Sequence, residues 1–314
     1  MIVIVAKGDD DHAVVVAQTL IHKLNEQVFI FDTSQFPMHY HLEGVIENDI
    51  FDFSLLSPHH PPIKIDNAKS IWWRRPQSMI MASDIQDYDI QNFTLNECIS
   101  GLHGMLTSCT VLWVNDLKNS YAADYKPFQL KTASQVGLQI PDTLITNDPN
   151  RAVEFWQKHD GNVIYKAFNE KGLIWSPTRR LTQEHLSAIN RIQFAPVIFQ
   201  PFIAGTVDVR VTVVGRHIFA TEFQIIDKEA VDYRIDLTNI PCRPHYLPEN
   251  LQRKIRQYMD VLGLVYGGLD FRVTPDGAYI FFEINTAGEF MYVQKLTGQP
   301  ISDAMAELLA HGSP

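Results

Sequence analysis

The sequence predicts an α/β protein built of α+β subdomains, because strands and helices follow two different patterns along it. Near the start, the short β-branched run 2–6 precedes apolar positions at helical spacing over 12–25 and a second apolar run at 28–31. Strand, helix and strand in this order are typical of a parallel α/β unit. Near the end, alternating valines over 207–213 and a turn at Gly215 predict an antiparallel sheet.

The rest of the first 115 residues is expected to complete an N-terminal domain. Prolines interrupt the segment 37–62, which therefore predicts irregular structure without long elements. An apolar run at 71–73, helical spacing over 92–106 and a last apolar run at 111–114 predict strand, helix and strand. We place this domain at residues 1–115.

Two further subdomains are expected, at residues 116–203 and 204–314. The first combines helices with short strands, and the second adds a helix and a hairpin to the antiparallel sheet. The expected elements are helices at 126–136, 149–158 and 248–262 and strands at 163–167, 197–202, 207–213, 218–226, 268–273 and 278–284.

The composition indicates a soluble, cytoplasmic protein with a large core. The chain has 314 residues, of which 46% are hydrophobic, and its start lacks the basic segment of a secretory signal. No apolar run approaches the roughly 18 residues that cross a bilayer. A formal net charge of −10 argues against a nucleic-acid partner, because phosphate binding depends on clustered Lys and Arg. The three cysteines lack CxxC spacing, so reduced structural thiols are expected.

Three oxygen-bearing side chains near the C-terminus predict a magnesium site. Asp270 lies in GGLDFRV, and Glu283 and Asn285 lie in FFEIN, on strands joined by a short turn. Alternation puts Glu283 and Asn285 on one face, and the hairpin brings Asp270 beside them. Such oxygens, together with nucleotide phosphates, suit Mg²⁺. The competing interpretation is a solvated hairpin with surface acids, but both acids interrupt apolar strands, where an unpaired charge is costly.

Two lysines are candidate phosphate ligands. Lys166 ends an apolar run and precedes the loop Asn-Glu-Lys-Gly at 169–172, whose backbone N–H groups can cradle the same anion. Lys126 is the second candidate. A lysine taken alone is more often a solvent-exposed residue, so the two gain weight only together with the other motifs.

Two acid–arginine pairs leave two interpretations open. Asp208 and Arg210 share one face of a strand, as do Asp232 and Arg234. Each pair can be a local salt bridge. Alternatively, Arg210 or Arg234 neutralises an acyl phosphate or a transferring phosphoryl group, a role suited to a planar guanidinium.

The order of these motifs resembles the ATP-grasp superfamily, especially its peptide-modifying ligases such as the ribosomal protein S6 glutamate ligase. The resemblance covers about residues 115–309. Its landmarks are Lys126 before a helix ending in GLQIPDT, then VIYKAF, IFQPFI, DVRVTVVG, DYR, GGLDFRV, FFEIN and KLTGQPI. It implies an ATP-grasp fold with an N-terminal pre-ATP-grasp α/β domain. It also implies an Mg-ATP ligase that activates a carboxylate as an acyl phosphate and passes the acyl group to an amine or hydroxyl.

The resemblance implies a role for each matching residue. The implied cofactor-binding residues are Lys126 and Lys166 on the phosphates, Gln200, Pro201, Phe202 and Ile203 around adenine, and Asp208. The implied metal ligands are Asp270, Glu283 and Asn285, and the implied catalytic residues are Arg210 and Arg234. Two features depart from many relatives: Pro201 stands where an acid is common, and the loop 169–172 is short and poor in glycine.

A motif in the N-terminal region resembles one branch of this superfamily in particular. Residues 71–76 read IWWRRP and resemble the W-x-R-R-P element in the pre-ATP-grasp domain of microviridin-type maturases, the graspetide synthetases of RiPP biosynthesis. Those enzymes join Asp or Glu side chains of a ribosomal precursor peptide to Thr, Ser or Lys side chains, which closes macrocyclic esters or amides. The alternative is that Trp72 and Trp73 are core and rim aromatics and that Arg74 and Arg75 pair with the many acids of the chain.

The resemblance also implies partners and leaves two other functions open. The expected partners are a precursor peptide with a leader segment and further copies of the chain, in a dimer. Polar loops at 169–176 and 228–244 are expected to close over the site. The other functions are ligation of glutamate to a peptide or protein terminus and nucleotide binding without turnover. The complete set of presumed metal ligands argues against the second.

Overall fold

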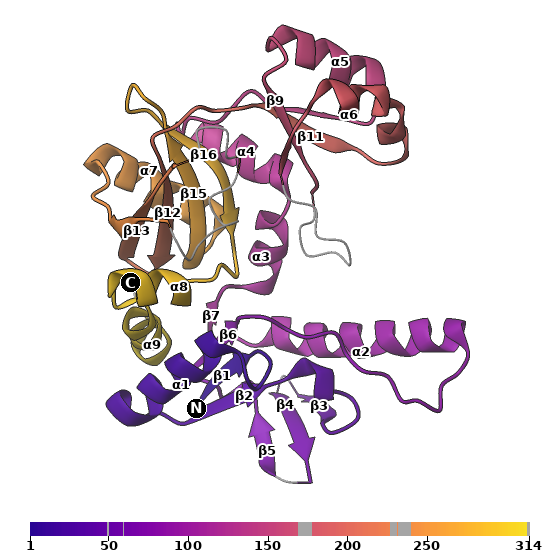
Figure 1. The fold of residues 1–314 in the computed structure, drawn as a ribbon. Coiled ribbons are helices and arrows are strands. Elements are labelled where there is room, and N and C mark those ends of the chain that lie inside the picture. Colours follow the sequence, from indigo (N-terminus) through magenta and orange to yellow (C-terminus); the bar gives the residue numbers. More distant parts are fainter. Residues whose placement is uncertain (49, 59, 169–177, 227–230, 232–239, 313–314) are drawn as a thin grey trace.

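The computed structural model describes residues 1–48, 50–58, 60–168, 178–226, 231 and 240–312. Figure 1 shows an N-terminal part at the bottom, a larger sheet at the upper left and a small sheet at the upper right. Arg234, the loop 169–172 and most of the two expected lid loops lie outside the described residues. In the described part of the chain, none of the helices has the length and apolarity needed to cross a membrane.

A parallel sheet forms the centre of the N-terminal part, as predicted. Its strands run in the order β2-β1-β6-β7. The elements are β1 (Ile2–Val5), α1 (Asp11–Leu24), β2 (Val28–Phe31), β6 (Ser70–Trp73), α2 (Tyr88–Ser108) and β7 (Leu112–Val114). Alternation gives the sheet two apolar faces: Ile2 and Ile4 pack with α1, whereas Val3 and Val5 pack with α2.

The segment predicted to be irregular is in fact a second sheet. β3 (His41–Glu47), β4 (Ile50–Ser57) and β5 (His60–Lys64) form an antiparallel meander after the short 3₁₀ helix η1 (Thr33–Gln35). The prediction was wrong because Pro61 and Pro62 were taken as breakers. They lie in β5, which pairs only with β4 in this sheet, and an edge strand tolerates a missing N–H donor.

The small sheet is antiparallel, with strand order β10-β9-β11-β8. Its elements are β8 (Leu144–Thr146), α5 (Pro149–Lys158), β9 (Val163–Lys166), β10 (Arg179–Arg180), α6 (Gln183–Ser187), η2 (Ile189–Phe194) and β11 (Val197–Pro201). Ala152 of α5 packs against Val163 and Phe199 of the sheet. The predicted helix and both predicted strands are confirmed here.

The larger sheet has the order β14-β13-β12-β15-β16, and all its pairings are antiparallel, as predicted. Its strands are β12 (Val207–Val214), β13 (His217–Gln224), β14 (Cys242–Pro244), β15 (Tyr266–Val273) and β16 (Tyr279–Asn285). The helices α4 (Lys126–Gln135) and α7 (Glu249–Leu262) cover one face through a shared core. The opposite face is apolar at one end, where Val214, Phe223 and Tyr266 pack with α9, and elsewhere it carries polar side chains such as Arg210 and Asp270.

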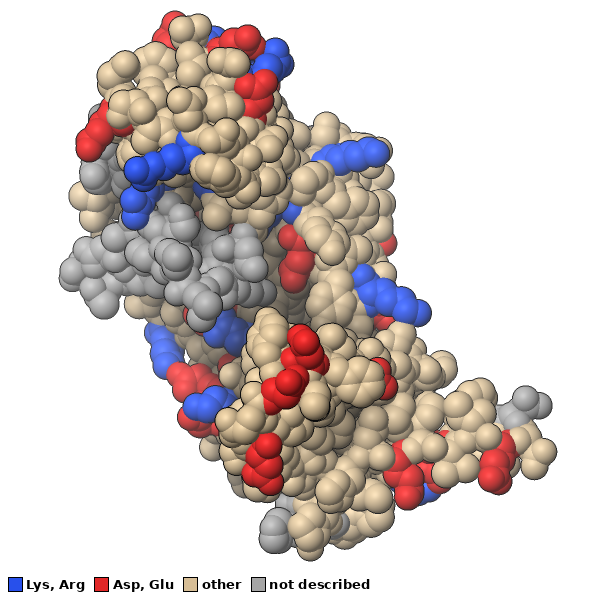
Figure 2. All heavy atoms as spheres, turned by 90° about the vertical axis from the view of Figure 1, so that its right-hand side faces the viewer, with Lys and Arg blue, Asp and Glu red and all other residues tan. Residues whose placement is uncertain are grey.

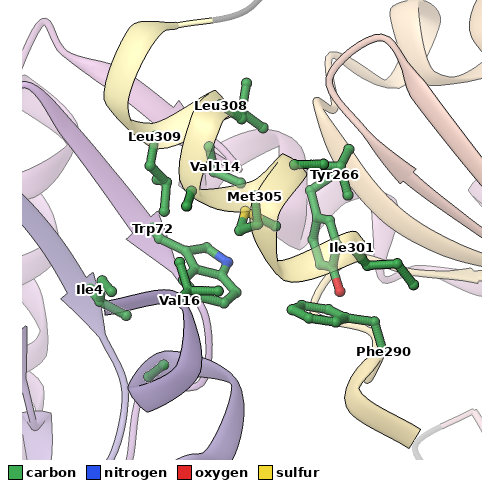
Figure 3. Close-up of a cluster of buried hydrophobic side chains, with 14 of the residues drawn as sticks. Ile4, Val16, Trp72, Val114, Tyr266, Phe290, Ile301, Met305, Leu308 and Leu309 are labelled. Carbon is green, nitrogen blue, oxygen red and sulfur yellow. The ribbon is translucent and has the colours of Figure 1, made fainter. Parts of the chain in front are cut away.

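Three helices without a sequence prediction join the parts. They are α3 (Leu117–Ala123), α8 (Met291–Thr297) and α9 (Ile301–His311). Figure 3 shows α9 side chains such as Met305 beside Trp72 of β6 and near Tyr266 of β15. The N-terminal sheet and the larger sheet therefore share one apolar core.

Candidate active site

An open cleft lies where the small sheet meets the polar part of the larger sheet. Several residues that the sequence singled out line it together. They are Lys166, Gln200, Pro201, Phe202, Ile203, Asp208, Asp270 and Glu283. The remaining lining residues are Ile164, Thr178, Val231, Phe271, Arg272 and Phe282.

Strand register explains how distant residues meet in the cleft. Lys166 is the last residue of β9 and lies opposite Ile198 of β11. On the larger sheet, Arg210 lies opposite Asp270, and Asp270 lies opposite Glu283 on the other side. Because opposed residues in a sheet point the same way, three neighbouring strands present charged groups to one face.

The acid–arginine pairs run across strands and not along them. Arg210 Nη1 donates to both oxygens of Asp270, at 3.0 and 2.9 Å. Arg272 donates to Asp208 from Nε at 2.7 Å and from Nη2 at 2.8 Å. The interpretation of Asp208 and Arg210 as a local pair therefore does not match the described contacts. Each partner is buried, so the low-dielectric surroundings strengthen both pairs.

Lys126 reaches the acids from α4. Its Nζ lies 2.5 Å from Glu283 Oε2, and both side chains are largely buried. Lys126 is not among the residues that line the cleft, whereas Glu283 is. The contact places a second cation beside the carboxylate predicted to bind metal.

The donor set suits a hard divalent cation. Asp270 and Glu283 are directly opposed carboxylates on the cleft wall, and Asn285 follows two residues later on the same face of β16. Within the described ranges no three His, Cys, Asp or Glu side chains gather closely enough to hold a metal. The Asn285 amide and phosphate oxygens would therefore have to complete the coordination.

The part of the cleft around Gln200 contains a buried hydrogen-bond acceptor, the side-chain oxygen of this residue. Gln200 Nε2 donates to Thr143 Oγ1 at 3.0 Å, which fixes the amide. Gln200 Oε1 is buried, and it accepts no hydrogen bond from any described residue. A buried acceptor without a donor is costly. This end of the cleft is therefore suited to a ligand with an N–H group.

Arg272 is a further charged residue of the cleft, which the sequence patterns did not single out. It lines the cleft, holds Asp208 and donates to the Ile203 carbonyl at 3.0 Å. Its guanidinium carbon also lies 5.7 Å from the centroid of the Phe202 ring. Strand alternation could have predicted this position, because Arg272 follows Asp270 by two residues in GGLDFRV and so lies on the same face of the strand.

The IWWRRP element contacts the end of the larger sheet. Trp72 and Trp73 are buried in the cores, and Arg74 Nη1 donates to the Ala287 carbonyl at 2.5 Å. Arg75 forms an ion pair with Glu289 at 2.8 Å. Arg74 Nε also lies 3.5 Å from Asp10 Oδ1, so both arginines of the motif pair with acids.

His12 links the same two parts as a neutral acceptor. The backbone N–H groups of Phe290 and Met291 donate to His12 Nε2 at 3.0 and 3.1 Å. Burial, followed by the charge of Arg74, lowers the pKa of His12 to about 3. The imidazole therefore stays uncharged in the folded protein at any ordinary pH.

We expect the free energy of unfolding to fall as the pH drops below about 6.5, the usual histidine pKa. Unfolded His12 then binds a proton that the folded form excludes, so stability present above this pH is lost toward pH 3. The loss from His12 is at most about 1.4 kcal/mol per pH unit. Urea unfolding on both sides of this pH measures it. His12→Gln keeps a neutral acceptor and should flatten the slope, whereas an unchanged slope would contradict the assignment.

Comparisons with known proteins agree with this geometry. The MvdD pre-ATP grasp domain family matches residues 1–121. No curated protein matches the sequence. The macrocyclase MdnC from Microcystis aeruginosa MRC, solved with its precursor peptide MdnA, is 27% identical, with a TM-score of 0.87 and coverage of 98% of each chain.

Two further solved structures are similar over nearly the whole chain. A RiPP-associated ATP-grasp ligase from Chryseobacterium gregarium, in complex with ADP and a leader and core peptide, is 27% identical with a TM-score of 0.89, covering 100% of this chain and 97% of that one. Macrocyclase MdnB from Microcystis aeruginosa MRC is 27% identical with a TM-score of 0.81, covering 99% of each chain. These matches confirm the predicted α/β ATP-grasp fold and its pre-ATP-grasp domain. They also confirm the predicted resemblance to graspetide-type ATP-grasp ligases and support an ATP-dependent ligase.

Proposed function

We propose that this chain is an ATP-dependent ligase that closes side-chain ester or amide macrocycles in a ribosomally made precursor peptide. The observation that carries the proposal is the opposed pair Asp270 and Glu283 in the same cleft as Lys166 and Gln200. The arrangement offers two carboxylates for a metal ion, a lysine for the ATP phosphates and a hydrogen-bond acceptor for the adenine ring. The likeness to MdnC and to the Chryseobacterium ligase supports the peptide as substrate.

The nucleotide would lie between the proposed subdomains 116–203 and 204–314. Gln200 Oε1 would accept a hydrogen bond from the adenine amino group, a donor that a 6-oxo purine lacks. Phe202 and Ile203 would flank the base, and the Pro201 backbone continues the same wall. Asp208 would act through Arg272, which it holds against this end of the cleft.

The residues present fit an Mg²⁺ ion at the phosphate end. Asp270, Glu283 and Asn285 would hold it, and the ion would supply charge neutralisation of the phosphates. Lys166 would contact phosphate oxygens directly. Lys126 would contact them after leaving Glu283, which it holds in this structure.

The reaction would proceed in two transfers. A precursor carboxylate oxygen attacks the γ-phosphorus of ATP, the bond to the bridging oxygen breaks, and ADP leaves. Phosphoryl transfer demands mainly positioning and charge stabilisation, which Lys166 and Arg210 can supply from fixed positions. A side-chain hydroxyl or amine then attacks the acyl carbon, loses its proton and displaces phosphate. Arg234 is proposed to act with Arg210 near the phosphates and the acceptor.

The proposed partners are a precursor peptide with a leader and a second copy of the chain. Figure 2 shows Lys and Arg scattered among Asp and Glu on one face of the molecule, and not gathered into one broad basic patch. Large apolar side chains on the N-terminal part are exposed, including Ile46, Ile50 and Phe93 at 65%, 68% and 66%. Exposed apolar side chains of this kind favour self-association. We also propose that the enzyme is cytoplasmic and meets its precursor peptide in the cytoplasm.

Intact-mass spectrometry of the small peptide encoded beside the gene tests the function. With protein and Mg-ATP, the peptide should lose the mass of one water for each bond, in step with ADP formation. Addition of an amino-acid residue to the peptide would support a glutamate-type ligase instead. Nucleotide binding without ADP formation would support a scaffold.

A further inference from the structure

The loop 286–290 follows directly from β16, the strand that bears Glu283 and Asn285. It packs closely on Arg210. The Glu289 carbonyl lies 3.4 Å from Arg210 Nη2, and a Cβ at either Gly288 or Gly268 would collide with the guanidinium. Arg210 therefore lies between two glycine backbones while its Nη1 holds Asp270. The position of this loop fixes how Arg210 presents the Asp270 carboxylate.

Side chains of the N-terminal domain hold this loop at successive points. Arg74 donates to the Ala287 carbonyl, Arg75 pairs with the Glu289 carboxylate, and His12 accepts from the N–H groups of Phe290 and Met291. The loop is therefore positioned by a domain far from it in sequence. Figure 3 shows Phe290 next to Tyr266, whose hydroxyl also donates to the Gly288 carbonyl.

Burial separates these contacts by strength. Arg74 is 0% exposed and His12 is 6% exposed, whereas the side chains of Arg75 and Glu289 are 46% and 49% exposed. Exposed ion pairs contribute little because water screens them, and buried hydrogen bonds from a charged donor contribute more. The contacts that hold the loop 286–290 most strongly are therefore those of Arg74 and His12.

We infer that Arg74 is a positioning residue for the metal site. It holds the Ala287 carbonyl and, through the loop, sets Arg210, Asp270 and the end of β16. The pre-ATP-grasp domain thus completes the catalytic centre of the neighbouring domain. The inference rests on the proposed function, because it assumes that Mg²⁺ and nucleotide bind at Asp270 and Glu283.

Isothermal titration of ADP at several Mg²⁺ concentrations tests the inference without turnover. Arg74→Lys keeps the charge but loses the rigid fork. We expect it to raise the Mg²⁺ concentration for half-maximal ADP binding about 10-fold, the lower end of effects from groups that orient metal ligands. ADP affinity in EDTA should stay within about 2-fold, because the loop does not line the base end of the cleft.

Ser70→Ala is the matched control. Ser70 is also buried, and its hydroxyl donates to the Leu309 carbonyl at 2.7 Å, so it too joins β6 to the C-terminal part. It does not touch the loop, and its Mg²⁺ dependence should equal that of the unsubstituted protein. If Arg74→Lys does not fold, His12→Leu removes the neighbouring anchor and should shift the Mg²⁺ dependence in the same direction.

The outcomes separate the two proposals. Normal Mg²⁺ dependence in a folded Arg74→Lys, or an equal shift in Ser70→Ala, overturns the positioning role and leaves the proposed function intact. Absence of Mg²⁺-dependent ADP binding in the unsubstituted protein overturns the proposed function and the inference with it.

Discussion

Replacing Glu283 by Gln should lower turnover at least about 100-fold, the scale of losing one preorganised charged group at a reacting centre. Glu283 is buried, opposes Asp270 across the strands and holds Lys126 at 2.5 Å. The amide keeps the shape but removes the charge that a metal ion and Lys126 need. Steady-state ADP release with peptide present measures the loss.

Glu222 provides the matched control for this substitution. It is another buried acid of the same sheet, held by Arg243 and His245 away from the cleft. Glu222→Gln should change stability but keep turnover within about 3-fold once folded, because distant sites act independently. Comparable losses of turnover in both variants would show that the effect of Glu283→Gln is structural and would refute the metal assignment.

Replacing Arg272 by Met should lower the free energy of unfolding by about 3–5 kcal/mol, the cost of removing one partner of a buried ion pair. Arg272 and Asp208 are 2% and 4% exposed and share two hydrogen bonds. Removal of the arginine leaves the Asp208 carboxylate without these donors. Denaturant unfolding measures the change.

The double variant Arg272→Met with Asp208→Leu should recover most of the lost stability, because the buried carboxylate that Arg272 neutralised is also removed. Lys158→Met is the surface control. Lys158 pairs with Asp142 at 3.0 Å with both side chains well exposed, so its loss should cost less than about 1 kcal/mol. Equal costs for Arg272→Met and Lys158→Met would contradict the account of the buried pair.

Local patterns predicted the parts of the site that depend on strand alternation. Glu283 and Asn285 share a face because they are two residues apart, and the short turn after β15 brings Asp270 opposite Glu283. The same rule would have found Arg272. Prolines misled the prediction of β5, because a breaker in a central strand is harmless in an edge strand.

The contacts that join the domains could not be predicted in this way. Arg74 and Ala287 are 213 residues apart, and His12 and Phe290 are 278 apart. No periodic pattern specifies such pairs, because they depend on how α9 packs between two sheets. The motif IWWRRP pointed to the pre-ATP-grasp domain whose family model matches residues 1–121, but only the structure connects Arg74 to the loop after β16.

In the proposed mechanism, a peptide carboxylate is activated as an acyl phosphate. Precursor peptide labelled with oxygen-18 in its side-chain carboxyl groups tests it directly, with released phosphate analysed by ³¹P NMR. The account predicts one labelled oxygen in phosphate for each bond closed, because the attacking carboxylate oxygen leaves with phosphorus. Phosphate without label, formed while the peptide closes its rings, would contradict it.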